Sequence, residues 1–220
     1  MDKLVKTKDL FDCKNKYICK LFEDTKYSWE ILKNLKEYID NMISDGINGF
    51  NEISEGVFVG ENVKIYPNTT ILPPAIIGNG TQIRPGAFLR GYVLIGENCV
   101  IGNSSELKSC VLLDNVQVPH YNYVGDSVLG NYSHMGAGAI CSNLKSDKKP
   151  VVIRGDEEYE TGLKKVGAIL ADYADIGCGC VLNPGTVVGK RTSVYPLTSV
   201  RGVVPADCIV KSMDNIVIRK

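Results

Sequence analysis

The sequence predicts an all-β fold, a left-handed parallel β-helix of about six triangular coils with a small N-terminal helical segment. Two observations lead to this prediction. A large aliphatic residue recurs every six positions from residue 59, and a small or β-branched residue follows most of them four positions later. An α-helix repeats about every 3.6 residues and a simple strand every two, so a period of six predicts short flat strands that meet at corners.

Three runs of the repeat can be read along the chain. The first has large aliphatic residues at Val59, Ile65, Ile71, Ile77, Ile83, Leu89, Ile95, Ile101, Leu107 and Leu113. The second has Leu129, Met135 and Cys141, and the third has Ile176, Leu182, Val188, Val194 and Val200. These 18 repeats, taken three to a coil, give the six coils. At the spacing of neighbouring strands, six coils stack into a prism about 29 Å tall.

Three parts are expected: a helical segment at residues 1–52, the β-helix at 53–205 and two C-terminal strands at 206–220. The segment should contain an amphipathic helix that is capped by Ser28, ends at Gly46 and packs against the first coil. An extra segment in a solenoid must leave the coil as a loop, and such loops commonly carry function. The two interruptions therefore predict loops near 118–128 and 144–167. The second loop, rich in charge, either covers a neighbouring surface or is simply solvated.

Composition excludes several classes of function. The 25 basic residues balance the 25 acidic ones, so no overall field attracts nucleic acid or anionic membranes. No apolar run is long enough to span a membrane, and the Lys-rich start lacks the apolar core of a signal peptide. We therefore expect a cytoplasmic protein. The eight cysteines are scattered and form no C-x-x-C pair, which favours reduced thiols.

The two histidines, His120 and His134, are both expected to point away from the prism interior. His120 lies in the first interruption, where an imidazole would serve as a general base. Glu106 precedes it by 14 positions, roughly one coil, and is expected to contact His120 and fix its tautomer. The alternative for each histidine is an ordinary surface residue.

Other polar residues suggest anion binding rather than metal binding. Arg84 and Lys108 fall at outward positions where their charges could hold a phosphate, although either could be ordinary surface charge. Two histidines cannot supply a three-histidine metal site. Cys178 and Cys180 form a C-x-C pair, but Cys180 is an inward position, so we expect no metal.

Four sequence words occur in order between Ile83 and Val200. They are IRPGAFLRG, ELK at 106–108, HYNYVGD at 120–126 and MGAGAICSN at 135–143. In these words the chain resembles the hexapeptide-repeat acyltransferases, in particular the acetyltransferase domain of the bifunctional glucosamine-1-phosphate acetyltransferase and N-acetylglucosamine-1-phosphate uridyltransferase. The segment before the first repeat is too short for the uridyltransferase domain, so pyrophosphorylase activity is not expected.

The resemblance implies an acetyl-CoA-dependent N-acetyltransferase for an amino sugar phosphate or a nucleotide-linked amino sugar, related to UDP-N-acetylglucosamine. It implies a homotrimer with active sites between neighbouring prisms, and His120 as the base, assisted by Glu106. Substrate contacts are then expected from Arg84, Lys108, Tyr123, His134 and Lys149. Contacts with acetyl-CoA are expected from Ala137, Asn143 and Cys178.

Two positions depart from the family pattern. His134 replaces an asparagine before GAG, and Leu144 replaces a tyrosine after Asn143. Two alternatives to the N-acetyltransferase therefore stay open. One is a non-catalytic trimeric scaffold or regulatory partner of a separate sugar nucleotidyltransferase, and the other is an acyltransferase with a hydroxyl or amino-acid acceptor.

Overall fold

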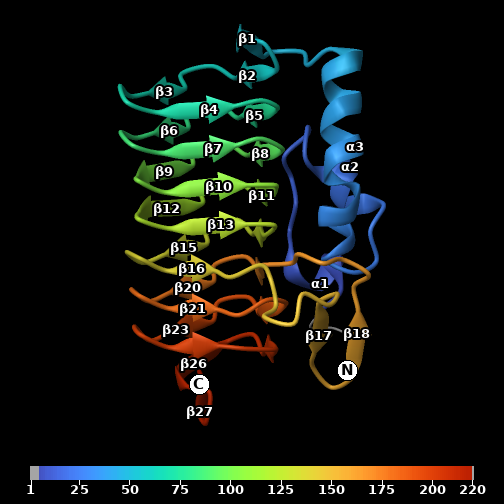
Figure 1. Cartoon of the computed structure of the whole chain (residues 1–220), viewed down its shortest axis with the longest axis vertical. Coiled ribbons are helices and arrows are strands. Elements are labelled where there is room, and N and C mark those ends of the chain that lie inside the picture. The colour runs from blue at the N-terminus through green and yellow to red at the C-terminus, as the bar shows by residue number, and fades with distance from the viewer. Residues whose placement is uncertain (1–4, 220) are drawn as a thin grey trace.

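A computed structural model describes residues 5–219 as a parallel β-solenoid with helices along one side (Figure 1). The chain runs through three sheets in turn. The first sheet contains β1 (Asn51–Ser54), β2 (Val57–Val59), β5 (Ala75–Ile77), β8 (Val93–Ile95), β11 (Cys110–Leu112), β14 (Val128–Leu129), β19 (Ala168–Leu170), β22 (Thr186–Val188) and β25 (Val203–Val204). The third sheet contains β4 (Thr70–Leu72), β7 (Phe88–Arg90), β10 (Glu106–Lys108), β13 (Tyr123–Gly125), β16 (Ile140–Cys141), β21 (Val181–Leu182) and β24 (Ser199–Val200).

The second sheet lies between these two along the chain. It contains β3 (Lys64–Ile65), β6 (Gln82–Ile83), β9 (Val100–Asn103), β12 (Gln117–His120), β15 (His134–Met135), β20 (Asp175–Ile176), β23 (Ser193–Val194), β26 (Cys208–Ser212) and β27 (Asn215–Ile218). The pairing is parallel throughout, except that β1 and β27 close the two ends as antiparallel strands. The expected C-terminal strands are therefore β26 and β27.

The six predicted coils are too few, because the first and second sheets contain eight parallel strands each besides the antiparallel β1 and β27. Part of the difference in coil number comes from residues 118–128, where the sequence predicts a loop. That segment is instead part of the solenoid, as strands β12 and β13. The step along the chain from Val57 to its partner Ala75 is one residue longer than the step from Glu106 to its partner Tyr123. One residue is lost at the corner that follows the third sheet, so the six-residue register shifts without a loop.

The shift decides which leucine faces the interior. Leu112, not Leu113, packs in the core of the prism with the aliphatic residues of neighbouring coils, including Leu107. Leu113 lies in the second apolar cluster, outside the prism and beneath the N-terminal segment. Most of the predicted inward residues are buried, but Ile65 in the terminal coil is 39% exposed because fewer coils cover it. Strand stacking, rather than a strict period, sets the register.

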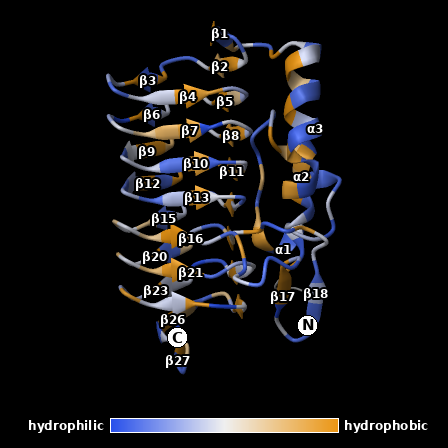
Figure 2. Ribbon diagram, in the orientation of Figure 1, coloured by the Kyte–Doolittle hydropathy of each residue, from blue (hydrophilic) through white to orange (hydrophobic). Residues whose placement is uncertain are grey.

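The N-terminal segment covers the outer surface of the first sheet. It contains α1 (Thr7–Leu10), α2 (Cys19–Glu23) and α3 (Glu30–Asp45), and α3 runs along several coils rather than against the first one alone (Figure 1). Hydrophobic and hydrophilic residues alternate along α3 (Figure 2). Its buried side chains share one apolar cluster with outward residues of the first sheet, among them Ile76 and Leu94. This packing buries a sheet surface that would otherwise be an exposed apolar patch.

The start of α3 differs from the expected cap. Ser28 makes no capping hydrogen bond, and its buried hydroxyl has no partner among residues 5–219. The carboxylate of Glu30 instead accepts the backbone N–H groups of Lys26 and Tyr27, both at 2.8 Å. Gly46 ends the helix with a φ of 80°, which a glycine adopts without strain.

Residues 144–167 leave the solenoid as an excursion, which contains the antiparallel hairpin of β17 (Val152–Arg154) and β18 (Glu158–Glu160). Across it, Val128 of β14 pairs with Ile169 of β19, so the coils continue in register. The excursion folds onto the N-terminal segment, since the Tyr159 ring lies 5.7 Å from the rings of both Tyr27 and Trp29. Among residues 5–219, none of the helices has the length and apolar character needed to cross a bilayer.

A ladder of polar side chains fastens the N-terminal segment to the prism. At the corner between the first and second sheets, Asp172 accepts the backbone N–H groups of Asp12 at 2.7 Å and Asn131 at 2.8 Å. Its carboxylate also lies 3.7 Å from the ammonium group of Lys190. In an earlier coil of the same corner, the amide of Asn15 donates to the Asp114 carboxylate at 2.7 Å. Burial raises the pKa of Asp172 above its ordinary value.

Replacing Asp172 by alanine tests the ladder. Asp172 is 1% exposed, so Asp172→Ala leaves the backbone N–H groups of Asp12 and Asn131 without their acceptor. We expect the free energy of unfolding to fall by about 3 kcal/mol, measured by urea denaturation. The matched variant Asp207→Ala removes a more exposed corner carboxylate, which pairs with Arg191, and should cost much less. Equal losses for the two variants would contradict this account.

Candidate functional site

The first interruption of the repeat lies at a corner between the second and third sheets, at residues 120–122, which we call the His120 corner. His120 ends β12, and its backbone N–H donates to the side-chain oxygen of buried Asn122 at 3.0 Å. The amide of Asn122 donates onward to the carbonyl of Gly136 at 2.8 Å. Tyr121 between them has a φ of 52° and is 64% exposed. This anchor holds His120 in an exposed position, and its imidazole makes no hydrogen bond within residues 5–219.

Ala137 and Cys178 lie directly below His120 in the next two coils. The N–H of Gly138 donates to the His120 carbonyl at 3.0 Å, and that of Gly179 donates to the Ala137 carbonyl at 2.8 Å. All three side chains are exposed. The structure therefore brings the predicted base and two predicted cofactor contacts together along one edge of the prism.

His134 lies on the second sheet beside this edge, in a pair that sequence reasoning missed. Its Nδ1 lies 2.8 Å from the carboxylate of Asp175, one coil further on. His134 pairs in register with Gln117, three residues before His120 on β12. At the rise of a strand, His120 therefore lies about 10 Å further along the sheet and one coil up. Asp175 comes after the excursion in sequence. Its pairing with His134 therefore depends on how β20 aligns with β15, which the local sequence pattern does not show.

Glu106 does not meet His120. Its carboxylate lies 2.7 Å from the guanidinium of Arg90, and no hydrogen bond joins it to His120 in the described part of the chain. The predicted contact is wrong because the spacing between Glu106 and His120 is shorter than one coil here. Residue Asn103 occupies the place one coil before His120, and Glu106 pairs with Tyr123 on the third sheet.

Four predicted residues gather instead in a polar cluster on the third sheet. Lys108 lies 3.3 Å from the Asp126 carboxylate, which also accepts from the amide of Asn143 at 2.5 Å. The same amide donates to the hydroxyl of Tyr123 at 3.1 Å. The cluster consists of Arg90, Glu106, Lys108, Tyr123, Asp126 and Asn143. Partial burial raises the pKa of Tyr123, which keeps its phenol protonated near neutral pH.

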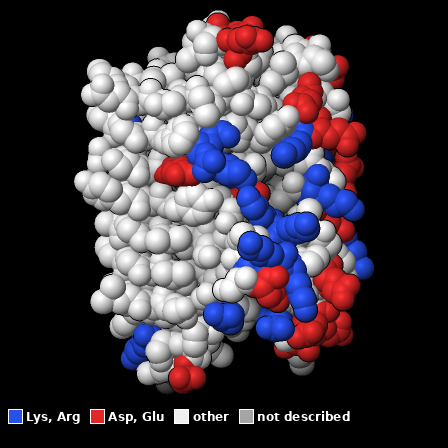
Figure 3. Space-filling model, in the orientation of Figure 1, with Lys and Arg blue, Asp and Glu red and all other residues white. Residues whose placement is uncertain are grey.

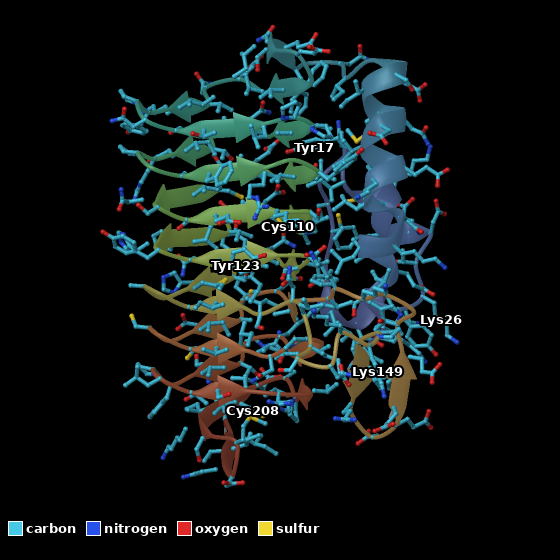
Figure 4. All side chains as sticks on the ribbon, viewed as in Figure 1. Tyr17, Lys26, Cys110, Tyr123, Lys149 and Cys208 are labelled. Atoms are coloured by element: carbon cyan, nitrogen blue, oxygen red, sulfur yellow. The ribbon has the colours of Figure 1, made fainter. Side chains whose placement is uncertain are left out.

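Two further predicted residues lie apart from the cluster. Arg84 is half-buried on the turn after β6, and its carbonyl accepts from the Thr69 hydroxyl at 3.3 Å. Lys149 is exposed on the excursion, well separated from Tyr123 on the third sheet (Figure 4). The structure thus does not bring Lys149 to the cluster.

A basic hollow of about 380 Å³ opens where the excursion meets the last coils of the third sheet. Its charged lining residues are Lys145, Asp147, Arg154 and Arg201, an excess of positive charge. The guanidinium of Arg201 donates to the side-chain oxygen of Asn183 at 3.1 Å, which directs it toward the hollow's wall. Figure 3 shows a band of basic side chains on one face of the molecule, while much of the solenoid surface beside the band carries no charge. Such a hollow is suited to phosphate groups.

The cysteines at the C-x-C pair point in opposite directions. Cys180 is buried in the core and Cys178 is exposed, as the repeat requires. Within residues 5–219, no three histidine, cysteine or acidic side chains gather as metal ligands would.

Comparisons with known proteins agree with the resemblance read from the sequence. The family model described as the GMPPB C-terminal domain matches residues 71–157. The bifunctional protein GlmU of Methanococcus aeolicus is 35% identical over 190 residues, which are 86% of this chain and 45% of that protein. A bifunctional sugar-1-phosphate nucleotidylyltransferase/acetyltransferase of Sulfurisphaera tokodaii is 31% identical over 173 residues, 76% of this chain and 43% of that protein.

Solved structures are more distant. A variant of perosamine N-acetyltransferase from Caulobacter crescentus, with CoA and GDP-perosamine, is 16% identical, with a TM-score of 0.44 over 72% of this chain and 56% of that one. The present chain spans about half the length of the curated relatives it matches. Over most of its own length, it resembles the acetyltransferase portion of the GlmU-type bifunctional proteins.

Proposed function

We propose that this chain is an acyl-CoA-dependent acyltransferase, an N-acetyltransferase that uses acetyl-CoA on an amino sugar phosphate or a nucleotide-linked amino sugar. The observation that carries the proposal is the similarity to GlmU-type proteins, and the shared exposed edge of His120, Ala137 and Cys178 supports it. Uridylyl transfer is not assigned to these residues. The proposal includes the left-handed coil expected from the repeat and a cytoplasmic location.

His120 is the proposed general base. Its imidazole, exposed and without a hydrogen-bond partner within residues 5–219, is free to accept a proton from the substrate's amine as nitrogen attacks the thioester carbon. A backbone N–H is proposed to stabilise the oxyanion, and the leaving group is the CoA thiolate. Because Glu106 pairs with Arg90, we propose that it positions the polar cluster rather than the imidazole.

Lys108, Tyr123 and Arg84 are proposed to bind the phosphate of the acceptor, and His134 to contact the sugar. In the free protein, Asp126 neutralises Lys108, so phosphate binding must compete with that ion pair. Ala137 and Cys178 are proposed to line the path of acetyl-CoA below His120, with Asn143 nearby. The basic hollow would receive the phosphates at the other end of CoA, and Lys149 on the excursion would add positive charge.

A homotrimer is part of the proposal. Apolar side chains stand exposed on and near the edge that carries His120: Leu197 is 85% exposed and Tyr121 is 64% exposed. Large apolar side chains exposed to this extent are expected on a surface that another chain covers. A neighbouring prism over this edge would enclose the site from a second side.

The alternative is a non-catalytic trimeric scaffold or regulatory partner of a separate sugar nucleotidyltransferase. It is favoured by His134, which replaces the family's asparagine and is held by Asp175, and by the pairing of Lys108 with Asp126. An acyltransferase with a hydroxyl or amino-acid acceptor is the third candidate. The three differ in whether CoA binds and which acceptor reacts.

Removing the imidazole tests the mechanism. With acetyl-CoA and glucosamine-1-phosphate, His120→Ala should release free thiol at least about 100-fold more slowly than the wild type, because proton removal is lost. The control Gln117→Ala changes an exposed side chain on the same strand and should keep the wild-type rate. Equal rates for His120→Ala and the wild type would refute the assigned base.

The proposed phosphate contact of Lys108 can be tested separately from proton removal by His120. Lys108→Gln should raise the KM for a phosphorylated acceptor about tenfold and leave the KM for acetyl-CoA unchanged, because one charge-assisted contact is lost. The matched variant Lys64→Gln, exposed on the second sheet, should change neither constant. An unchanged acceptor KM would remove Lys108 from the phosphate site.

Calorimetry with CoA separates the enzyme from the scaffold. The acyltransferase proposal expects saturable binding that weakens when Arg201→Ala removes a charge from the basic hollow. Heat signals indistinguishable from dilution for the wild-type protein would favour the scaffold.

A further inference from the structure

Two thiols of the N-terminal segment lie in direct contact. The sulfur of Cys19, at the start of α2, is 2.6 Å from the sulfur of Cys13, in the stretch between α1 and α2. Both side chains are partly exposed, whereas five of the other six cysteines are buried and the sixth, Cys178, lies alone on the surface. A disulfide has a sulfur separation of about 2.05 Å, so bonding requires a movement of only about 0.6 Å.

The pair opens into a surface pocket of about 480 Å³. Among residues 5–219, the charged side chains of its lining are Lys6, Lys8, Lys26 and Glu23. A reagent seated here would meet both sulfurs from the solvent side.

The residues between the two cysteines hold the segment on the solenoid. Asn15 donates to the Asp114 carboxylate at 2.7 Å, and the Tyr17 hydroxyl donates to the Ile95 carbonyl at 2.9 Å. The Tyr17 carbonyl in turn accepts from the Tyr38 hydroxyl of α3 at 3.0 Å. A disulfide between Cys13 and Cys19 would therefore close residues 13–19 into a covalent loop. That loop contains the residues that attach this segment to two coils.

We propose that Cys13 and Cys19 form a reversible redox pair, oxidised to a disulfide by a low-molecular-weight disulfide such as oxidised glutathione, which locks residues 13–19 against the solenoid. One thiolate attacks a glutathione sulfur and releases one glutathione thiol. The second thiolate then attacks the mixed disulfide and releases the other. Two protein S–H bonds are replaced by one S–S bond, and the two protons leave on the two glutathione thiols.

Burial raises the pKa of both thiols, for Cys13 together with the contact to Cys19. Exchange should therefore be slow near neutral pH and accelerate as the pH rises, because the thiolate is the attacking species. Rare disulfides of reducing compartments are commonly redox-sensing, so the pair is compatible with a cytoplasmic location.

Mass spectrometry tests the pair on the folded full-length chain. After equilibration with glutathione buffer, free thiols are alkylated and the denatured protein is digested with trypsin. We expect peptides 9–14 and 17–20 to be joined by a disulfide that reduction splits. Cys178 should be recovered alkylated or as a glutathione adduct. Recovery of Cys13 and Cys19 on separate peptides, both alkylated or both carrying glutathione, would overturn the proposal.

Variants and an unfolded control sharpen the result. Cys13→Ser should leave Cys19 as a stable glutathione adduct, whereas Cys178→Ser should leave the 9–14 to 17–20 link unchanged. If the link forms equally well in urea-unfolded protein, sequence proximity explains it and the folded geometry does not.

Lys14 and Lys16 lie exposed between the two cysteines, so oxidation should slow native tryptic cleavage there roughly threefold or more. Unchanged or faster cleavage would refute the lock.

Discussion

The structure depends on one constraint: each coil must place its strands in parallel register on the strands of the coil before. The backbone hydrogen bonds of the three sheets run between coils, so a change in length within one coil has to be absorbed at a corner or expelled. The chain uses both solutions. It removes one residue at the corners after β10 and β13, and it expels residues 144–167 as an excursion between β16 and β19.

The same constraint explains why the helices are needed. A solenoid buries one surface of each sheet and leaves the other exposed, and the outward residues of the first sheet, such as Ile76, Leu94 and Val111, are apolar. The N-terminal segment and the excursion hairpin cover them together, joined through the rings of Tyr27, Trp29 and Tyr159. Corner carboxylates such as Asp172 and Asp114 then give the cover a fixed position, since they bond both to neighbouring coils and to the segment.

The register of the strands between coils also brings the residues of the candidate site together. His120, Ala137 and Cys178 are far apart in sequence, yet they share one edge because each occupies the same place in successive coils. Asp175 reaches His134 across the excursion for the same reason. On the third sheet, charges that would each look ordinary in sequence are paired with one another, and Asp126 contacts both Lys108 and Asn143. Any ligand of that cluster must exchange with contacts that already exist.

The sequence by itself determined the repeat, the buried aliphatic residues of the prism, the amphipathic helix and the terminal pair of strands, because each depends on local periodicity. It also predicted that Cys180 points inward. Only the tertiary structure decided the number of coils, the shift from Leu113 to Leu112, the partner of Glu106 and the meeting of Cys13 with Cys19. These depend on how corners of different length bring strands into register and how the N-terminal segment folds back, and no periodic pattern records either one.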